Sequence, residues 1–130
     1  MKSQADFLRI GAILGGLGVI LGAFGAHGLK ARVDVEMLAV FEVAVRYQMY
    51  HALAVFGLAC GPCWAWSLPW ARRACWAWLF GIAVFSGSLY LMALTGQKWL
   101  GAITPIGGVA LILGWALVLL SAKGFKGAGH

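Results

Sequence analysis

A set of polar side chains lies within or beside long apolar segments, where hydrogen-bonding groups are rare. Its members are His27, Tyr47, Gln48, Tyr50, His51, Ser86, Ser88, Tyr90 and Thr104. Imidazole, phenol and hydroxyl groups at such depth can bind a small ligand, relay a proton or hold an ion. They can also form hydrogen bonds that hold helices together. Two histidines without a nearby carboxylate or thiol are a poor ligand set, so we expect no metal.

A second candidate chemistry is carried by the cysteines. Cys60-Gly61-Pro62-Cys63 has the spacing of a thiol–disulfide exchange motif, and Cys75 is expected near the same surface. Three thiols can also bind a soft metal. The motif follows an apolar segment, however, whereas reactive cysteines of this kind lie at a helix N-terminus. We therefore treat Cys60, Cys63 and Cys75 as a candidate thiol site and favour simple packing.

The sequence contains no phosphate loop, no nucleophile triad and no paired carboxylates. We therefore expect neither enzymatic activity nor a cofactor.

The elements that must position these residues follow from the composition. Hydrophobic residues make up 62% of the 130 residues and charged residues 11%, which is far too apolar for a soluble domain of this length. The charged residues leave four uncharged windows, each long enough for one helical crossing of a bilayer. We predict an all-α integral membrane four-helix bundle formed by a single domain, residues 1–130. The predicted spans are about 7–26, 47–66, 74–95 and 103–122.

A charged segment separates the first two spans. Over residues 33–46 the charges gather on one helical face and apolar residues on the other, which predicts an amphipathic helix in the membrane interface. Asp34 is placed to cap its start. Glu42 and Arg46 are spaced to form an ion pair. The pattern leaves open whether this helix bends into the second span or continues straight.

Small residues mark one face of the first span. Glycines recur there at spacings of four and three, at Gly11, Gly15, Gly18, Gly22 and Gly25. Such a face lets another helix approach closely. We predict a packing seam, either against this chain or against another copy.

The basic residues predict the orientation. With four spans, one side holds Lys2, Arg9, Arg72, Arg73, Lys123 and Lys126, and the other holds Lys30, Arg32, Arg46 and Lys98. The richer side is expected in the cytoplasm, so both termini are predicted there. The net charge of +6 is then explained by topology, and no nucleic-acid partner is expected. In this orientation the polar side chains of the four helices converge on the outer half of the membrane.

Four sequence blocks carry a family resemblance. They are Gly22-Ala23-Phe24-Gly25-Ala26-His27-Gly28-Leu29, Tyr47-Gln48-Met49-Tyr50-His51-Ala52-Leu53-Ala54, Phe85-Ser86-Gly87-Ser88-Leu89-Tyr90, and Ile103-Thr104-Pro105-Ile106-Gly107-Gly108 with Gly114-Trp115. In this order they resemble the small membrane proteins called domain of unknown function 423. The resemblance implies a four-helix protein of bacterial inner or mitochondrial membranes, and it implies no reaction or substrate. The blocks coincide with the segments that converge on the outer side, whereas the cysteine motif lies outside them.

Two classes of function remain open. The favoured one is a structural, assembly or accessory subunit of the bacterial inner membrane, because packing alone can explain each feature. Its expected partners are the lipid bilayer and either further copies of itself or a larger membrane complex. The alternative is a binder or conductor of a small molecule, ion or proton through the outer polar cluster. Cysteine-based redox or metal handling is a third hypothesis of lower weight.

Overall fold

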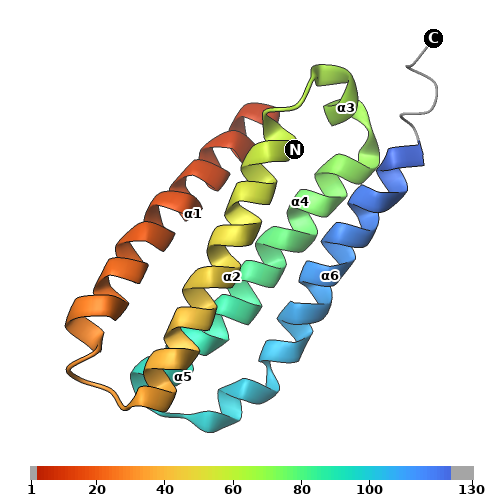
Figure 1. Ribbon diagram of the computed structural model, residues 1–130. Helices are drawn as coiled ribbons and strands as arrows, with labels where there is room; N and C mark the ends of the chain where they lie inside the picture. Colours follow the sequence, from red (N-terminus) through yellow and green to blue (C-terminus); the bar gives the residue numbers. More distant parts are fainter. Residues whose placement is uncertain (1–2, 124–130) are drawn as a thin grey trace.

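The computed structural model describes residues 3–123, and every regular element in that range is a helix (Figure 1). Lys2 and Lys126, which contribute to the predicted orientation, lie outside it. The elements are α1 (Gln4–Phe24), the π-helical turn η1 (Gly25–Leu29), α2 (Val35–Ala59), α3 (Cys63–Ser67), α4 (Pro69–Gly81), the π-helical turn η2 (Ile82–Ser86), α5 (Gly87–Thr95), the 3₁₀ turn η3 (Lys98–Ala102) and α6 (Thr104–Ser121). The prediction of an all-helical chain is therefore confirmed for the described residues.

Consecutive elements join into long rods. The rods Gln4–Leu29, Pro69–Thr95 and Lys98–Ser121 are each long and apolar enough to cross a membrane. Helix α2 is of similar length but more polar, because Glu42, Arg46, Gln48 and His51 lie along it. It therefore differs from the three apolar rods in composition rather than in length.

Local signals explain where the helices begin and end. The side chain of Asp34 accepts a hydrogen bond of 2.8 Å from the backbone N–H of Met37, which confirms the predicted cap. Ser3 and Asp6 form a capping box at the start of α1. Helix α5 ends at Gly96, which has a φ of 73°, a left-handed conformation that glycine adopts without strain.

The charged segment 33–46 does not form a separate helix. It is the first part of α2, which continues unbroken from Val35 to Ala59. No proline or glycine interrupts the first five turns, so nothing there weakens the backbone hydrogen bonds. The predicted second span, 47–66, also extends too far. Helix α2 ends before Gly61 and Pro62, and α3 forms a separate short helix.

The long helices pack in an open row. Helix α1 packs on α2, α2 packs on the rod formed by α4 and α5, and that rod packs on α6. Figure 1 shows α1 and α6 at opposite edges of this row. Its largest core cluster is centred on buried Phe7, Val55, Cys75 and Trp78. Because α6 is held by α4 and η2 rather than by α2, a space remains between α2 and α6.

Candidate functional site

The central polar contact is made by Gln48, a buried residue of α2. Its Nε2 donates to the carbonyl oxygen of Leu14 at 2.8 Å, and its Oε1 accepts from the hydroxyl of Tyr90 at 2.6 Å. One amide thus joins α1, α2 and α5. In an apolar environment such a group is stable only when its donors and acceptors are paired.

The serine and threonine side chains of the predicted cluster are also paired inside the chain. The Ser86 hydroxyl donates to the carbonyl oxygen of Ala44 at 2.7 Å. Ser88 and Thr104 form a hydroxyl–hydroxyl hydrogen bond of 2.6 Å. These contacts connect η2 with α2 and α5 with α6. They act as cross-links between helices and leave few free donors or acceptors for a ligand.

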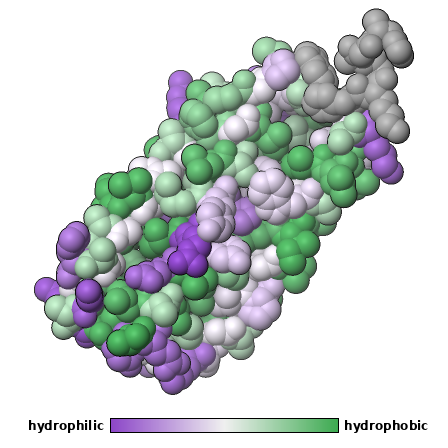
Figure 2. Space-filling view, viewed as in Figure 1, coloured by the Kyte–Doolittle hydropathy of each residue, from purple (hydrophilic) through white to green (hydrophobic). Residues whose placement is uncertain are grey.

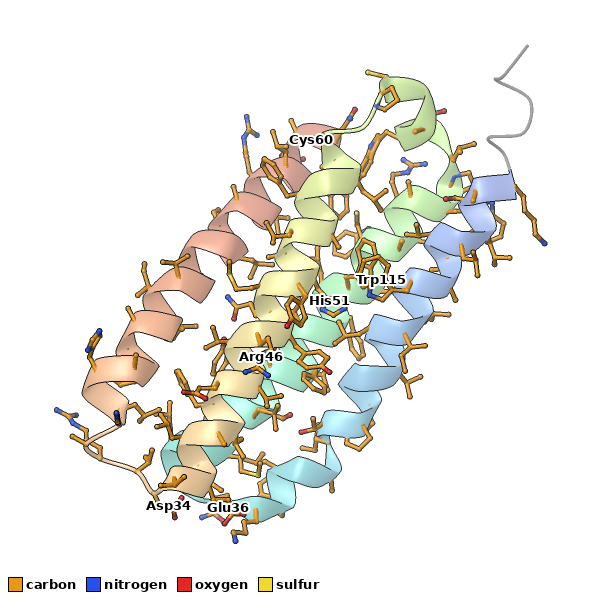
Figure 3. The ribbon with its side chains drawn as sticks, in the orientation of Figure 1. Asp34, Glu36, Arg46, His51, Cys60 and Trp115 are labelled. Atoms are coloured by element: carbon orange, nitrogen blue, oxygen red, sulfur yellow. The ribbon has the colours of Figure 1, made fainter. Side chains whose placement is uncertain are left out.

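His51 links α2 to α6. Its Nδ1 lies 2.7 Å from the carbonyl oxygen of Tyr47, and its Nε2 accepts from the indole N–H of Trp115 at 3.0 Å. Since Nε2 is the acceptor, the hydrogen of a neutral ring lies on Nδ1, where it is donated to the carbonyl. Figure 3 shows the His51 and Trp115 side chains facing one another between the two helices. A protonated ring would turn Nε2 into a second donor opposing that indole N–H.

A pocket of about 640 Å³ opens between α2 and α6. It is lined by Tyr47, Tyr50, His51, Phe85, Gly108, Leu111, Ile112 and Trp115. Its volume is in the range of small-molecule sites. The Tyr47 ring packs against Phe85 and Tyr50, with centroid separations of 4.8 and 5.8 Å. Within residues 3–123, neither the Tyr47 nor the Tyr50 hydroxyl has a hydrogen-bond partner.

Helix α6 makes close contacts with the α4–η2 segment. A Cβ at Gly107 would collide with the backbone of Phe85, and one at Gly114 would collide with the indole of Trp78. A Cβ at Gly81 would lie 2.5 Å from Leu111. Glycine at these positions therefore lets α6 lie directly on its neighbour.

The glycines predicted to form a seam on α1 do not all behave alike. A Cβ at Gly11 would lie 2.9 Å from the backbone nitrogen of Phe56, and one at Gly18 would overlap Met49. Gly25 faces Phe41 at 3.0 Å, and Gly22 faces Val45 at an ordinary 3.5 Å. Gly15, by contrast, has no atom within 4 Å. Most of this face is thus directed at α2 of the same chain.

His27 does not join the other candidate residues. It is exposed in η1, beyond the end of α1, and it makes no hydrogen bond or ring contact within the described part of the chain.

The three cysteines of the candidate thiol site lie in different environments, since Cys60 and Cys63 are exposed and Cys75 is buried. Among the described residues, no group of three histidine, cysteine, aspartate or glutamate side chains is placed to hold a metal ion.

Phe85, Gly108, Leu111, Ile112 and Trp115 belong to the pocket but were not among the predicted site residues. Four of them are on α6 at spacings of three, one and three, which is one helical face. That periodicity identifies a face but not its partner. Pairing with His51 is decided only by how α6 packs.

Comparison with known proteins identifies the family. Residues 21–108 match the family model described as "Protein of unknown function (DUF423)". The chain belongs to the DUF423 family. It is 44% identical over 123 residues to a UPF0382 membrane protein of Staphylococcus epidermidis, covering 93% of this chain and 98% of that protein. It is 43% identical over 116 residues to the UPF0382 membrane protein YwdK of Bacillus subtilis, covering 89% and 94%.

The predicted resemblance to this family is therefore confirmed. The part of the chain that matches the DUF423 model contains Gln48, His51, Ser86 and Tyr90, while Trp115 lies beyond it. No solved structure matches the chain. The relatives are named as membrane proteins, and the family description names no activity.

Proposed function

We propose that this DUF423 protein crosses a bacterial inner membrane four times, with both termini in the cytoplasm. Three apolar rods of sufficient length support three crossings. Helix α2 supports a fourth, because it is of similar length and packs lengthwise between α1 and the α4–α5 rod. The neighbouring residues Arg72 and Arg73, near the start of α4, favour a cytoplasmic position for that end.

Within this arrangement, the protein binds a small amphiphilic molecule that enters from the lipid. The observation that carries this proposal is the pocket between α2 and α6, with two tyrosine hydroxyls that lack a partner within the described residues. In a hydrocarbon environment an unpaired hydroxyl is costly, because no water is present to replace the missing hydrogen bond. A ligand that offers oxygen acceptors would remove that cost.

The lining defines the class of ligand. The walls are aromatic and aliphatic, and His51 is the one ionisable imidazole among them. A neutral apolar body with one or two carbonyl, ether or hydroxyl oxygens matches such a surface. His51 and Trp115 both line the pocket, and the hydrogen bond between them joins α2 to α6. Since both ring nitrogens of His51 are already used, we assign this residue a positioning role.

Lipid extraction from purified protein tests this proposal. The protein is purified in a mild detergent, and mass spectrometry is used to quantify each small molecule retained per mole of chain. We expect one compound of the stated class at near-stoichiometric amount. Ile112→Trp, which fills the pocket, should abolish its retention. Tyr50→Phe, which removes one hydroxyl and leaves the packing unchanged, should lower it severalfold.

A matched control is Ile13→Trp, at an exposed position of α1 away from the pocket. It should leave retention unchanged. If the purified protein carries no small molecule beyond bulk lipid, or if Ile112→Trp retains the same compound equally well, the binding proposal is wrong.

A structural or accessory subunit is the second candidate. It is favoured by the hydrogen bonds of Gln48, Ser86, Ser88 and Thr104, which all go to partners within the chain. Such a subunit should copurify with other proteins at a fixed stoichiometry and retain no defined small molecule. The same purification, followed by measurement of the native mass, separates the two candidates.

A further inference from the structure

Two charged residues project from the outer side of α2 in the middle of an apolar surface. Glu42 and Arg46 are both exposed. They lie one turn apart, yet they form no ion pair with each other or with any other residue in the described range, which corrects the ion pair expected from their spacing. Figure 2 shows a hydrophilic patch at the middle of this face, and Figure 3 shows Arg46 there, on the side of α2 that no other helix covers.

The course of α2 makes these charges unusual. From the sequence, Arg46 was expected at the membrane surface, because residues 33–46 were predicted to lie in the membrane interface. In the continuous helix, Arg46 lies about 16 Å from Val35 at 1.5 Å per residue. This distance is too great for the side chain to reach the helix end. Ionisable groups at such depth normally face a partner or a water-filled space rather than lipid.

The pattern of the whole outer face fits a helical partner. Ala39, Glu42, Arg46 and Leu53 are exposed and follow one another at spacings of three, four and seven. Further along, Gly57 has no atom within 4 Å of its Cβ position, so a second backbone can approach there. The two unpaired charges and this periodic pattern both indicate that another helix packs on this face.

We propose that this face of α2 binds the same face of a second copy of the chain. Two copies inserted in one membrane with the same orientation are related by a two-fold axis along the membrane normal. Their α2 helices then run parallel. Arg46 of each copy pairs with Glu42 of the other, since a long guanidinium side chain spans the single turn between their levels.

Charge complementarity favours a second copy over other occupants. An isologous interface must be self-complementary, and a surface that carries one acid and one base a turn apart meets this condition. An anionic lipid would pair with Arg46 but leave Glu42 unpaired and would repel it. This inference concerns the side of α2 that carries Glu42 and Arg46. The pocket proposed above adjoins it at Tyr50, which lines the pocket and follows Arg46 by one helical turn. Dimer mass and retention of a small molecule are measured separately, so either proposal can fail without the other.

The test uses charge reversal and native mass in mild detergent or lipid nanodiscs. The wild-type protein is expected at twice the chain mass of 13.8 kDa. Arg46→Glu produces a chain with two acids on this face, and Glu42→Arg produces a chain with two bases. Each variant alone should be monomeric. Coexpressed with different tags, the two variants should form a heterodimer, because every pair across the interface is again opposite in charge.

This design separates a failed interface from a failed fold. A misfolded variant would not regain its mass in the presence of the other variant. Glu36→Lys, a charge reversal at the exposed start of α2, is the matched control and should remain dimeric.

The proposal is overturned if the wild-type protein is monomeric in nanodiscs, or if either single variant remains a dimer. It is also overturned if the two variants fail to associate. A monomer that retains anionic lipid, and loses it in Arg46→Gln, would assign the face to lipid instead.

Discussion

At the scale of single residues, the polar groups within the helices divide into two kinds. Gln48, Ser86 and Tyr90 are bonded to partners on other helices and hold the helices in register. Tyr47 and Tyr50 line the pocket, and their hydroxyls have no hydrogen-bond partner within residues 3–123. Sequence analysis grouped all of these residues together, because their types and depths are alike. Their hydrogen-bond partners distinguish them.

The Gln48–Tyr90 contact gives a prediction at this scale. Gln48→Leu and Tyr90→Phe should each destabilise the protein, because each leaves the partner's polar group unpaired in an apolar environment. In a double-mutant cycle the coupling energy should be about 0.6 kcal/mol and no more than about 1.7 kcal/mol, as measured for hydrogen bonds between membrane helices. The measurement is reversible unfolding in mixed detergent micelles.

Tyr50→Phe is the matched control for that cycle. Its hydroxyl has no partner in the described range, so the free energy of unfolding should change little. A coupling energy indistinguishable from zero would show that the 2.6 Å contact contributes nothing to stability.

At the scale of helices, close packing depends on glycines from two separate segments. On α1, Gly11 and Gly18 allow contact with α2. On α6, Gly107 and Gly114 allow contact with η2 and α4. The first set was predicted from its spacing as a seam. The second set has the same function in the fold, although it was noted only as part of a resemblance. The two sets together hold both ends of the row.

Gly107 and Gly108 form a matched pair for testing this packing. Gly107→Ala should cost about 1–3 kcal/mol of unfolding free energy, because the new methyl group must displace the Phe85 backbone. Gly108→Ala should be nearly neutral or slightly stabilising, since its Cβ would lie 3.7 Å from the Phe85 ring. Both variants gain the same helix propensity, so their difference in unfolding free energy isolates the contact. Equal stabilities would contradict the close approach of α6.

At the scale of the whole molecule, the helices form a row with α2 near its middle. This arrangement leaves the outer side of α2 uncovered and opens the pocket beside it. The pocket and the uncovered face of α2 both result from this open row.

The topology can be tested with thiols already present. Cys60 and Cys63 are exposed at one end of the molecule and Gln97 lies in the turn at the other. In intact cells, a membrane-impermeant maleimide should fail to label Cys60 and Cys63 but should label Gln97→Cys in a chain with Cys60 and Cys63 changed to serine. Opening the inner membrane should expose the native pair. The reverse pattern would place both termini outside.

The sequence by itself determined the properties that depend on local pattern. These include the helical class, the Asp34 cap and the membership of the DUF423 family. Hydropathy and capping act over one or a few turns, so they can be recognised without knowing what lies across from them. The pattern left open whether the charged segment bends into the second span or continues straight, and the structure has one continuous helix there.

Only the tertiary structure decided which distant residues meet. Trp115 donates to His51 across 64 positions, Gly107 lies on Phe85, and His27 remains outside the cluster that its residue type suggested. Each outcome depends on the rotation of one helix against another. Interdigitating side chains and small residues set that rotation, and many sequences share the same periodicity while packing differently. The pocket and the exposed face of α2 are consequences of that packing.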